Sequence, residues 1–458
     1  MQRRRRLPRL VVSDRKAVPP MTSMVPHHDD RLRRLMEAWA ERLAEQGLAA
    51  AADEPFTVQL QRVFDASDFV AQTSLREPQL LLGLFDAGLL GRPRPPGELA
   101  AELSAALQEV AGVEALERAL RQFRRREMLR IVWRDIAAAA PLAETLEDLT
   151  RLADACIGQS LALLYAWACA KDGVPQDAAG RPQQLVVLGM GKLGARELNL
   201  SSDIDLIFAF PEHGQTEGPR AVANEQFFTL LGRQLIGVLS KQTVDGFVFR
   251  VDMRLRPFGD AGPLAMSFDA LETYYQSQAR DWERYAMIKA RVVAGDAAAG
   301  AELGEMLRPF IYRRYIDFSA IDSIRNMKRL IARELHRRGM AANIKLGPGG
   351  IREIEFIGQA FQLVRGGRDT DLQVRPILTV LERLGAKGLL PAFAVRELRE
   401  AYEFLRLTEN RIQAWKDEQN HKLPADPAGR ERLARSMDYP AWPQFAADLE
   451  RHRERVQQ

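Results

Sequence analysis

Apolar residues recur at helical spacing through the first third of the chain. Two examples are DRLRRLMEAWAERLAEQGL, which begins at Asp30, and the longer periodic stretch over 100–139. The intervening GRPRPPGE, residues 91–98, breaks the pattern with proline and glycine. We expect a helical N-terminal region over residues 31–175.

The pattern changes in the middle of the chain. Short apolar runs at 185–190 and 204–210 are bounded by turn residues and predict strands, and the alternating run at 246–257 predicts a third. A helical pattern over 220–241 separates the second and third strands. We therefore expect a small mixed sheet with helices over residues 176–310, an α+β domain.

Helical spacing returns from about residue 271 and continues to the end. The stretch ELREAYEFLRLTENRIQAWKDEQ, residues 397–419, is amphipathic and long, as in a helical bundle. We expect a helical bundle domain over residues 311–458.

The net charge of the chain is concentrated at its start. Residues 1–16 hold seven Lys/Arg and one Asp, and the remainder holds 58 Lys/Arg and 60 Asp/Glu. The body is therefore close to neutral, and no nucleic-acid partner is expected. We expect residues 1–30 to be a disordered basic tail, either an RNA-binding arm or sequence upstream of a start at Met21 or Met24.

Composition also bears on compartment. The apolar stretch over 161–170 is short of the ~20 residues that cross a bilayer, and Lys171 and Asp172 end it, so no membrane partner is expected. Cys156 and Cys169 have neither a zinc spacing nor a disulfide framework. Both cysteines indicate a reduced, cytoplasmic protein.

A glycine pattern, GMGKLG, follows the first predicted strand. It resembles a dinucleotide-binding turn, which requires a full crossover helix and an acidic residue at the end of the next strand. Here only residues 192–198 are available for the helix, and Asp203 and Asp205 come at the start of the second strand. Dinucleotide binding is therefore disfavoured.

Carboxylates are the better candidates for chemistry. Asp203 and Asp205 are two apart on a strand and face the same side, and Asp252 interrupts the third predicted strand. If these strands are neighbours, three negative charges share one volume, and a divalent cation relieves their repulsion. Oxygen ligands with room for phosphate favour Mg²⁺, with Mn²⁺ as a second choice. A D-x-D pattern can also be a solvated turn, as we expect for Asp369–Asp371.

Several neighbours are candidate phosphate ligands. Gly189 and Gly191 allow close backbone approach, and Lys192 opens the helix after them. Ser202 either donates to phosphate or caps the strand. Arg254 and Arg256 share a strand face with Asp252 and either fork onto phosphate oxygens or form a solvated edge.

A second glycine-containing motif, KLGPGGIREIEF, lies in the C-terminal region. Arg352 and Glu355 are three residues apart in the helix that it predicts. We expect the two side chains to pair with each other.

The arrangement resembles the nucleotidyltransferase superfamily of the polymerase-beta type. Four blocks over about 185–365 narrow the resemblance: LGMGKLGARELNLSSDIDLIF, FVFRVDMRLRPFGDAGPLAMS, YYQSQARDWERYAMIKARVVAGD and NIKLGPGGIREIEFIGQAFQL. They are similar to the glutamine synthetase adenylyltransferase family, bifunctional enzymes that add AMP to, and remove it from, a tyrosine of glutamine synthetase.

The resemblance implies a function for this half-length chain. Family members carry two nucleotidyltransferase domains, and this chain looks like the N-terminal, adenylyl-removing one, in which phosphate attacks tyrosyl-AMP and releases ADP. Asp203 and Asp205 would hold metal, and Asp252 would complete the ligands or act as a base. Glutamine synthetase and the PII signal protein are the implied partners. Two alternatives remain: adenylyl transfer from ATP, and a non-catalytic module that binds glutamine synthetase or PII.

Overall fold

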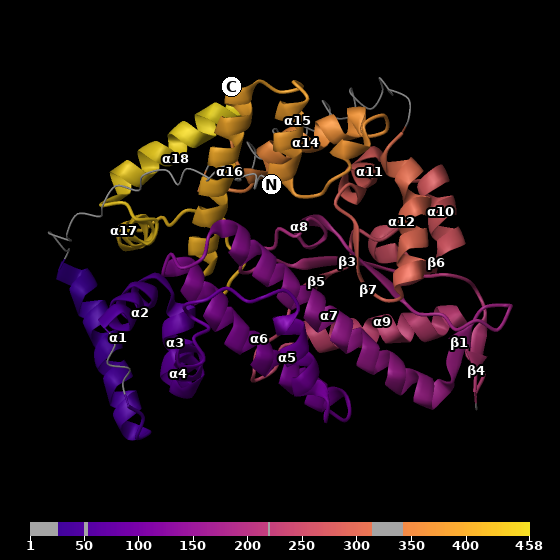
Figure 1. Cartoon of the computed structure of the whole chain (residues 1–458), viewed down its shortest axis with the longest axis horizontal. Coiled ribbons are helices and arrows are strands. Elements are labelled where there is room, and N and C mark those ends of the chain that lie inside the picture. The colour runs from indigo at the N-terminus through magenta and orange to yellow at the C-terminus, as the bar shows by residue number, and fades with distance from the viewer. Residues whose placement is uncertain (1–25, 50–53, 219, 314–341) are drawn as a thin grey trace, which may run out of the picture.

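The computed structural model describes residues 26–49, 54–218, 220–313 and 342–458. Most of the tail expected over 1–30 lies outside these residues, and the first helix begins at Pro26. Helices dominate the described chain, and the sheets are small (Figure 1). The helices before the first glycine motif are α1 Pro26–Glu45, α2 Glu54–Ala66, α3 Asp68–Arg76, α4 Pro78–Asp86, α5 Glu98–Leu107, α6 Val113–Ile136 and α7 Leu142–Asp172.

The middle of the chain alternates strands and helices. Its elements are β1 Val174–Gln176, β2 Val186–Gly189, α8 Gly191–Gly194, β3 Ile204–Phe210, β4 Gln215–Glu217, α9 Asn224–Ser240, β5 Val251–Asp252, β6 Ala265–Ser267, α10 Phe268–Ser277, α11 Asp281–Met287, β7 Arg291–Ala294 and α12 Ala297–Ile311. The first two predicted strands and the helix between the second and third are confirmed. The two-stranded sheet of β1 and β4 was not expected.

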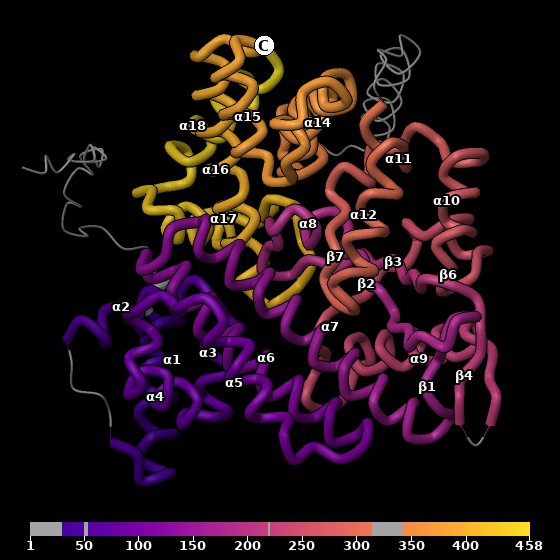
Figure 2. The backbone as a smooth tube through the Cα atoms, turned by 45° about the vertical axis from the view of Figure 1, so that its right-hand side comes forward, coloured from indigo at the N-terminus to yellow at the C-terminus, as the bar shows by residue number. Residues whose placement is uncertain are grey.

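The C-terminal part is helical, as the pattern predicts. Its elements are α14 Ile351–Arg365, α15 Ile377–Ala386, α16 Ala392–Gln413, α17 Pro427–Ser436 and α18 Trp442–Gln457. Figure 2 shows these helices gathered at the top of the view, where α17 packs on α2 of the N-terminal part.

The main sheet is mixed and has the order β5-β3-β2-β7, with β6 also paired to β3. β2 is antiparallel to β3 and β7, whereas β5 and β6 are parallel to β3. Both faces of the sheet are covered, which explains why β3 is a continuous apolar run rather than an alternating one.

Alternate residues of β3 enter two different cores. Leu206 and Phe208 pack with α7 and α9, and Ile207 and Ala209 pack with α10 and α12. On the first side, Gly232 of α9 lets the helix approach closely, because an added Cβ would lie 2.7 Å from the Phe208 ring. β3 is thereby held in place from both of its faces.

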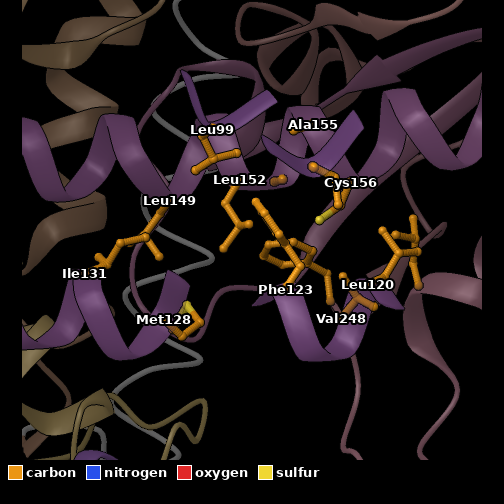
Figure 3. Close-up of a cluster of buried hydrophobic side chains, with 14 of the residues drawn as sticks. Leu99, Leu120, Phe123, Met128, Ile131, Leu149, Leu152, Ala155, Cys156 and Val248 are labelled. Carbon is orange, nitrogen blue, oxygen red and sulfur yellow. The ribbon is translucent and has the colours of Figure 1, made fainter. Parts of the chain in front are cut away.

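The N-terminal helices share the core of the first sheet face. Figure 3 shows its centre, where α5, α6 and α7 meet the chain before β5. The labelled side chains are Leu99, Leu120, Phe123, Met128, Ile131, Leu149, Leu152, Ala155, Cys156 and Val248. A separate core holds the C-terminal helices together.

Helix α7 passes a length and composition test for a membrane span among the described residues, with 39% of its apolar window buried. Core helices of globular proteins pass the same test. α7 packs on α5, α6 and α9, and its Cys156 is fully buried in the shared core. The buried residues of α7 lie between Thr145 and Leu164.

Candidate active site

The glycine turn lies directly over the start of β3. β2 ends at Gly189, α8 makes one helical turn, and the Met190 N–H donates to the Asp205 carbonyl at 2.9 Å. Gly191 has φ +52°, and a Cβ there would lie 2.9 Å from Oδ2 of Asp205. The missing side chain at Gly191 therefore leaves room for the Asp205 carboxylate.

Gly189 has a different neighbourhood. A Cβ at this position would lie 2.6 Å from Cγ1 of Val293 and 2.9 Å from the Leu193 side chain. Close packing between β2, α8 and β7 therefore explains why residue 189 is a glycine.

Three aspartates meet where β3 and β5 begin to pair. Asp205 is opposite Asp252 in the parallel register, and Asp203 immediately precedes β3. Buried Ile204 and Leu206 fix the alternation, so the carboxylates of Asp203 and Asp205 are held away from the core. The neighbouring strands required by the carboxylate hypothesis are present.

The charge of this group is only partly compensated. Burial and the neighbouring carboxylates of Asp252 and Asp203 together raise the pKa of Asp205 to about 6, although Lys345 and Arg254 act to lower it. The other two acids have arginine partners. Arg250 Nε donates to Asp203 at 2.7 Å, and Arg254 donates through its backbone N–H and side chain to Asp252. Hydrogen bonding from Arg254 lowers the pKa of Asp252.

The three aspartate carboxylates are chemically suited to bind a divalent cation. All three candidate ligands are carboxylates, which is the set that Mg²⁺ and Mn²⁺ prefer. The described residues contain no group of three acidic, His or Cys side chains already drawn together as a metal cage. Arg254 is the partner most easily exchanged for a cation, because its side chain is 75% exposed.

The third strand is shorter than predicted. A strand over 246–257 is wrong, because β5 covers only Val251–Asp252 and the chain then turns. Arg254 and Arg256 therefore do not lie on one strand face. Arg256 donates to the carbonyls of Met253 and Asp260 and stabilises the turn, whereas Arg254 lies exposed beside Asp252.

The side chains of Ser202 and Lys192 both bond to other groups of this chain. The Ser202 hydroxyl donates to Oδ1 of Asn199. Lys192 Nζ donates to Oε1 of Glu355 at 2.8 Å and to the Tyr402 hydroxyl at 3.2 Å. Burial lowers the pKa of Lys192 to about 8, with nearby Arg406 acting in the same direction.

Glu355 connects the glycine turn to the C-terminal helices. The expected pairing of Arg352 with Glu355 is wrong, because Glu355 pairs instead with Lys192 and Lys289. Burial opposes ionisation of Glu355, but the two lysines outweigh it and lower the pKa of the carboxyl. Figure 1 shows α8 between the sheet and α14, which is where this contact forms.

The C-terminal part also reaches the aspartates directly. Gln419 Nε2 donates to Oδ2 of Asp203 at 3.0 Å, and Lys345 lies close enough to lower the pKa of Asp205. Neither Gln419 nor Lys345 was predicted as a site residue, because no sequence pattern shows which residues of the C-terminal part face the sheet. Arg250 could have been found, since it lies two residues before Asp252.

The chain matches two known protein families. The family model described as glutamate-ammonia ligase adenylyltransferase matches residues 57–306, more than half of the chain. The chain belongs to the glutamate-ammonia ligase adenylyltransferase family. The matched range contains all three aspartates and the glycine turn, and the polymerase-beta-type fold predicted from the sequence is consistent with it. A second family model, GlnD PII-uridylyltransferase, matches residues 325–458.

Curated relatives of this adenylyltransferase family match almost the whole chain. A protein of Nitrosococcus oceani is 54% identical over 430 residues, covering 93% of this chain and 44% of the relative. One from Pseudomonas aeruginosa is 52% identical over 449 residues, covering 98% and 44%. One from Pseudomonas putida is 56% identical over 400 residues, covering 87% and 41%.

The relatives share one name and are longer than this chain. Each is called a bifunctional glutamine synthetase adenylyltransferase/adenylyl-removing enzyme. The chain spans less than half the length of these relatives. The family resemblance drawn from the four sequence blocks is thereby confirmed.

Proposed function

We propose that this chain removes AMP from an adenylylated tyrosine of glutamine synthetase by metal-dependent phosphorolysis. The observation that carries the proposal is the pairing of Asp205 with Asp252 on parallel strands, with Asp203 beside them and Gly191 above. Three carboxylates in one place suit a nucleotidyltransferase and have no evident use in a binding module. Both activities appear in the name of the relatives, and removal follows from the resemblance to the N-terminal half.

The proposed reaction is an exchange of one oxygen on phosphorus. An oxygen of inorganic phosphate attacks the phosphorus of tyrosyl-AMP, and the bond from phosphorus to the tyrosine oxygen breaks. The products are ADP and a tyrosine phenolate, which takes up a proton. Inorganic phosphate is already anionic near neutral pH, so a general base is less needed than for a tyrosine nucleophile.

The aspartates would hold Mg²⁺, or Mn²⁺ in its place. A bound divalent cation supplies charge neutralisation for the phosphates. Gly191 keeps the backbone clear of Asp205, and Arg254 is exposed at the edge of the site, where it can fork onto the incoming phosphate. Phosphate contacts from Lys192 and Ser202 remain predictions, since both side chains now bond protein atoms.

Two further assignments follow from the same resemblance. We expect a cytoplasmic protein that also interacts with the PII signal protein, a role supported by the match of residues 325–458 to the GlnD PII-uridylyltransferase model. Adenylyl transfer from ATP uses the same carboxylates, and it is the principal alternative. The two directions differ in their nucleophile, and that difference is what the test exploits.

The test incubates the chain with adenylylated glutamine synthetase, Mg²⁺ and phosphate and measures ADP. Phosphate-dependent ADP release supports the proposal, and AMP release without phosphate indicates hydrolysis instead. A parallel reaction with unmodified glutamine synthetase and ATP detects transfer. The Asp203→Asn/Asp205→Asn double variant is the matched control. It should be inactive and should lose any rise in melting temperature that Mg²⁺ gives the unsubstituted chain.

A further inference from the structure

Lys345 is a cation held beside the aspartates. The segment that carries Lys345 pairs with the stretch around His421, and Gln419 of that stretch donates to Asp203 at 3.0 Å. The charge of Lys345 also acts on the Asp205 carboxylate. Among the residues that the structure describes, the Lys345 ammonium has no hydrogen bond or ion pair, and the side chain is half-buried.

The other cations around the aspartates already have partners. Arg250 binds Asp203 and Ser201, Arg254 binds Asp252, and Lys192 binds Glu355. Arg256 donates to backbone carbonyls of its own turn. Within the described chain, Lys345 is therefore the cation at this site that can meet an anion without breaking a contact.

The backbone of Lys345 is fixed on both sides. Its N–H donates to Oδ1 of Asn343 at 3.0 Å, and its carbonyl accepts from the Arg352 N–H at 3.0 Å. Ile344, which is fully buried, donates its N–H to the His421 carbonyl at 2.9 Å. These bonds hold the Lys345 backbone in place.

The same segment meets the residue that reaches Asp203. Asn343 forms an isolated antiparallel bridge with Lys422, three residues after Gln419, whose side chain binds Asp203 at 3.0 Å. Two stretches of the C-terminal part thus lie side by side at the aspartates. One of them contributes an amide donor, and the other contributes an ammonium group.

Glu409 is a second acid on which the charge of Lys345 acts, and Glu409 has two nearer partners. Arg406 Nε lies 3.1 Å from one oxygen of Glu409, and His421 Nδ1 lies 2.9 Å from the other. The charge of Glu409 therefore does not explain why residue 345 is a lysine.

We propose that the ammonium of Lys345 binds a phosphate oxygen in the aspartate site, either of the nucleotide or of inorganic phosphate. The proposal rests on the proposed function, because it assumes that phosphate groups occupy this site. It extends that function by assigning a contact to the C-terminal part, outside the residues that carry the aspartates. Lysine binds phosphate as a point charge and keeps its reach on a flexible stem.

The test compares Lys345→Met and Lys345→Arg with Lys422→Met as the matched control. Lys422 is exposed, lies on the bridged stretch, and has no side-chain contact among the described residues. Binding of AMP, ADP and inorganic phosphate is measured by calorimetry with Mg²⁺, and the KM for phosphate is measured in the ADP-release assay. Melting temperatures check that each variant folds.

Loss of a charge-assisted contact should weaken phosphate binding about 10- to 100-fold in Lys345→Met. Weaker AMP and ADP binding identifies the nucleotide as the source, and a raised KM for phosphate with unchanged AMP binding identifies the incoming phosphate. Lys345→Arg should keep most of the affinity. If a folded Lys345→Met binds all three ligands as Lys422→Met does, the assignment is overturned.

Calorimetry measures ligand binding directly, so it tests the Lys345 contact separately from the direction of the reaction. A chain that binds ADP through Lys345 but releases no ADP from adenylylated glutamine synthetase contradicts the proposed function and supports the Lys345 contact. A chain that releases ADP normally after Lys345→Met, with unchanged binding, contradicts the contact and supports the proposed function.

Discussion

Asp205 has three neighbours that act on its carboxyl group in different ways. Gly191 leaves space for it, Asp252 faces it across the strand pair, and Asp203 adds a further negative charge on the same side. The first effect is steric and the other two are electrostatic. Substitutions at Gly191 and Asp205 should therefore fail in different ways.

The stability of the metal-free protein should depend on pH through Asp205. Its folded-state pKa is about 6, above the ordinary value of 3.8, so the folded protein binds the extra proton between these pH values. Stability from this group is therefore present below about pH 4 and is lost as the pH rises through about 6. The loss should amount to about 2 kcal/mol after allowance for partial exposure.

Asp205→Asn should remove this pH dependence. Urea unfolding at pH 4.5 and pH 8 in the presence of a chelator measures the effect. The variant should gain stability relative to the unsubstituted chain as the pH rises. Equal pH profiles for the two proteins would contradict the raised pKa.

Gly191→Ala should inactivate the chain. The backbone at Gly191 is left-handed, and an alanine Cβ would lie 2.9 Å from Oδ2 of Asp205. Moving this carboxylate misplaces a candidate metal ligand, so we expect at least a 100-fold loss of ADP release, about 3 kcal/mol in the barrier.

Gly237→Ala is the control for this substitution. Gly237 lies within α9 with open space around its Cβ position, and alanine there should stabilise by about 0.5–1 kcal/mol with full activity. An active Gly191→Ala protein would show that the turn does not constrain Asp205.

At the scale of elements, one buried carboxylate connects α8, β7 and α14. Glu355 accepts from Lys192 of α8 and from Lys289 before β7. Glu355 and Lys289 are buried, and the Lys192 side chain is 12% exposed. Glu355→Gln should leave two ammonium groups without their main counter-charge. We expect a loss of about 3–5 kcal/mol in unfolding free energy.

The matched control is Glu305→Gln, at an exposed ion pair with Arg308. It should change stability by less than about 0.5 kcal/mol. Urea unfolding of both variants measures the difference. Similar effects in the two would mean that the buried network contributes no more than a surface pair.

Sequence pattern predicts the elements well where local signals determine them. The runs at 204–210 and 220–241 are flanked by clear turn residues, and β3 and α9 form there. The strand expected over 246–257 fails because alternation continues past Asp252 while the chain turns. Backbone carbonyls hold Arg256 in that turn, and periodicity does not report such contacts.

The residues of the candidate site likewise divide into those that a local sequence signal reveals and those that it does not. Asp203, Asp205 and Asp252 could be found because their spacing on strands is local and carries a chemical meaning. Glu355 was found but assigned to the wrong partner, since Lys192 is 163 residues away in sequence. Gln419 carries no local signal, and Lys345 opens the KLGPGGIREIEF motif without any pattern that links it to the aspartates. The packing of the C-terminal helices brings both residues to β3.

Across the whole molecule, buried contacts join the C-terminal helices to the N-terminal ones. Arg411 of α16 pairs with Asp135 of α6, donates to the Asp135 carbonyl at 2.7 Å, and also donates to the Ser436 carbonyl at 2.9 Å. Nearby, the Phe69 N–H donates to the Trp415 carbonyl at 2.9 Å. These contacts hold the stretch that includes Gln419 against the part of the chain that carries the aspartates.

Arg411→Ala should therefore affect both stability and the site. Asp135, only 2% exposed, would lose its counter-charge, and we expect a loss of about 3–5 kcal/mol. Because Gln419 and Lys345 depend on the same helices, ADP release should also fall at temperatures where the protein remains folded.

Calorimetric melting and ADP release measured together test this coupling. Arg399→Ala serves as the control, because among the residues that the structure describes Arg399 of α16 pairs only with exposed Glu382 and Glu403. It should leave both measurements nearly unchanged. If Arg411→Ala lowers the melting temperature but the folded protein releases ADP at the normal rate, the C-terminal helices stabilise the molecule without helping to form its site.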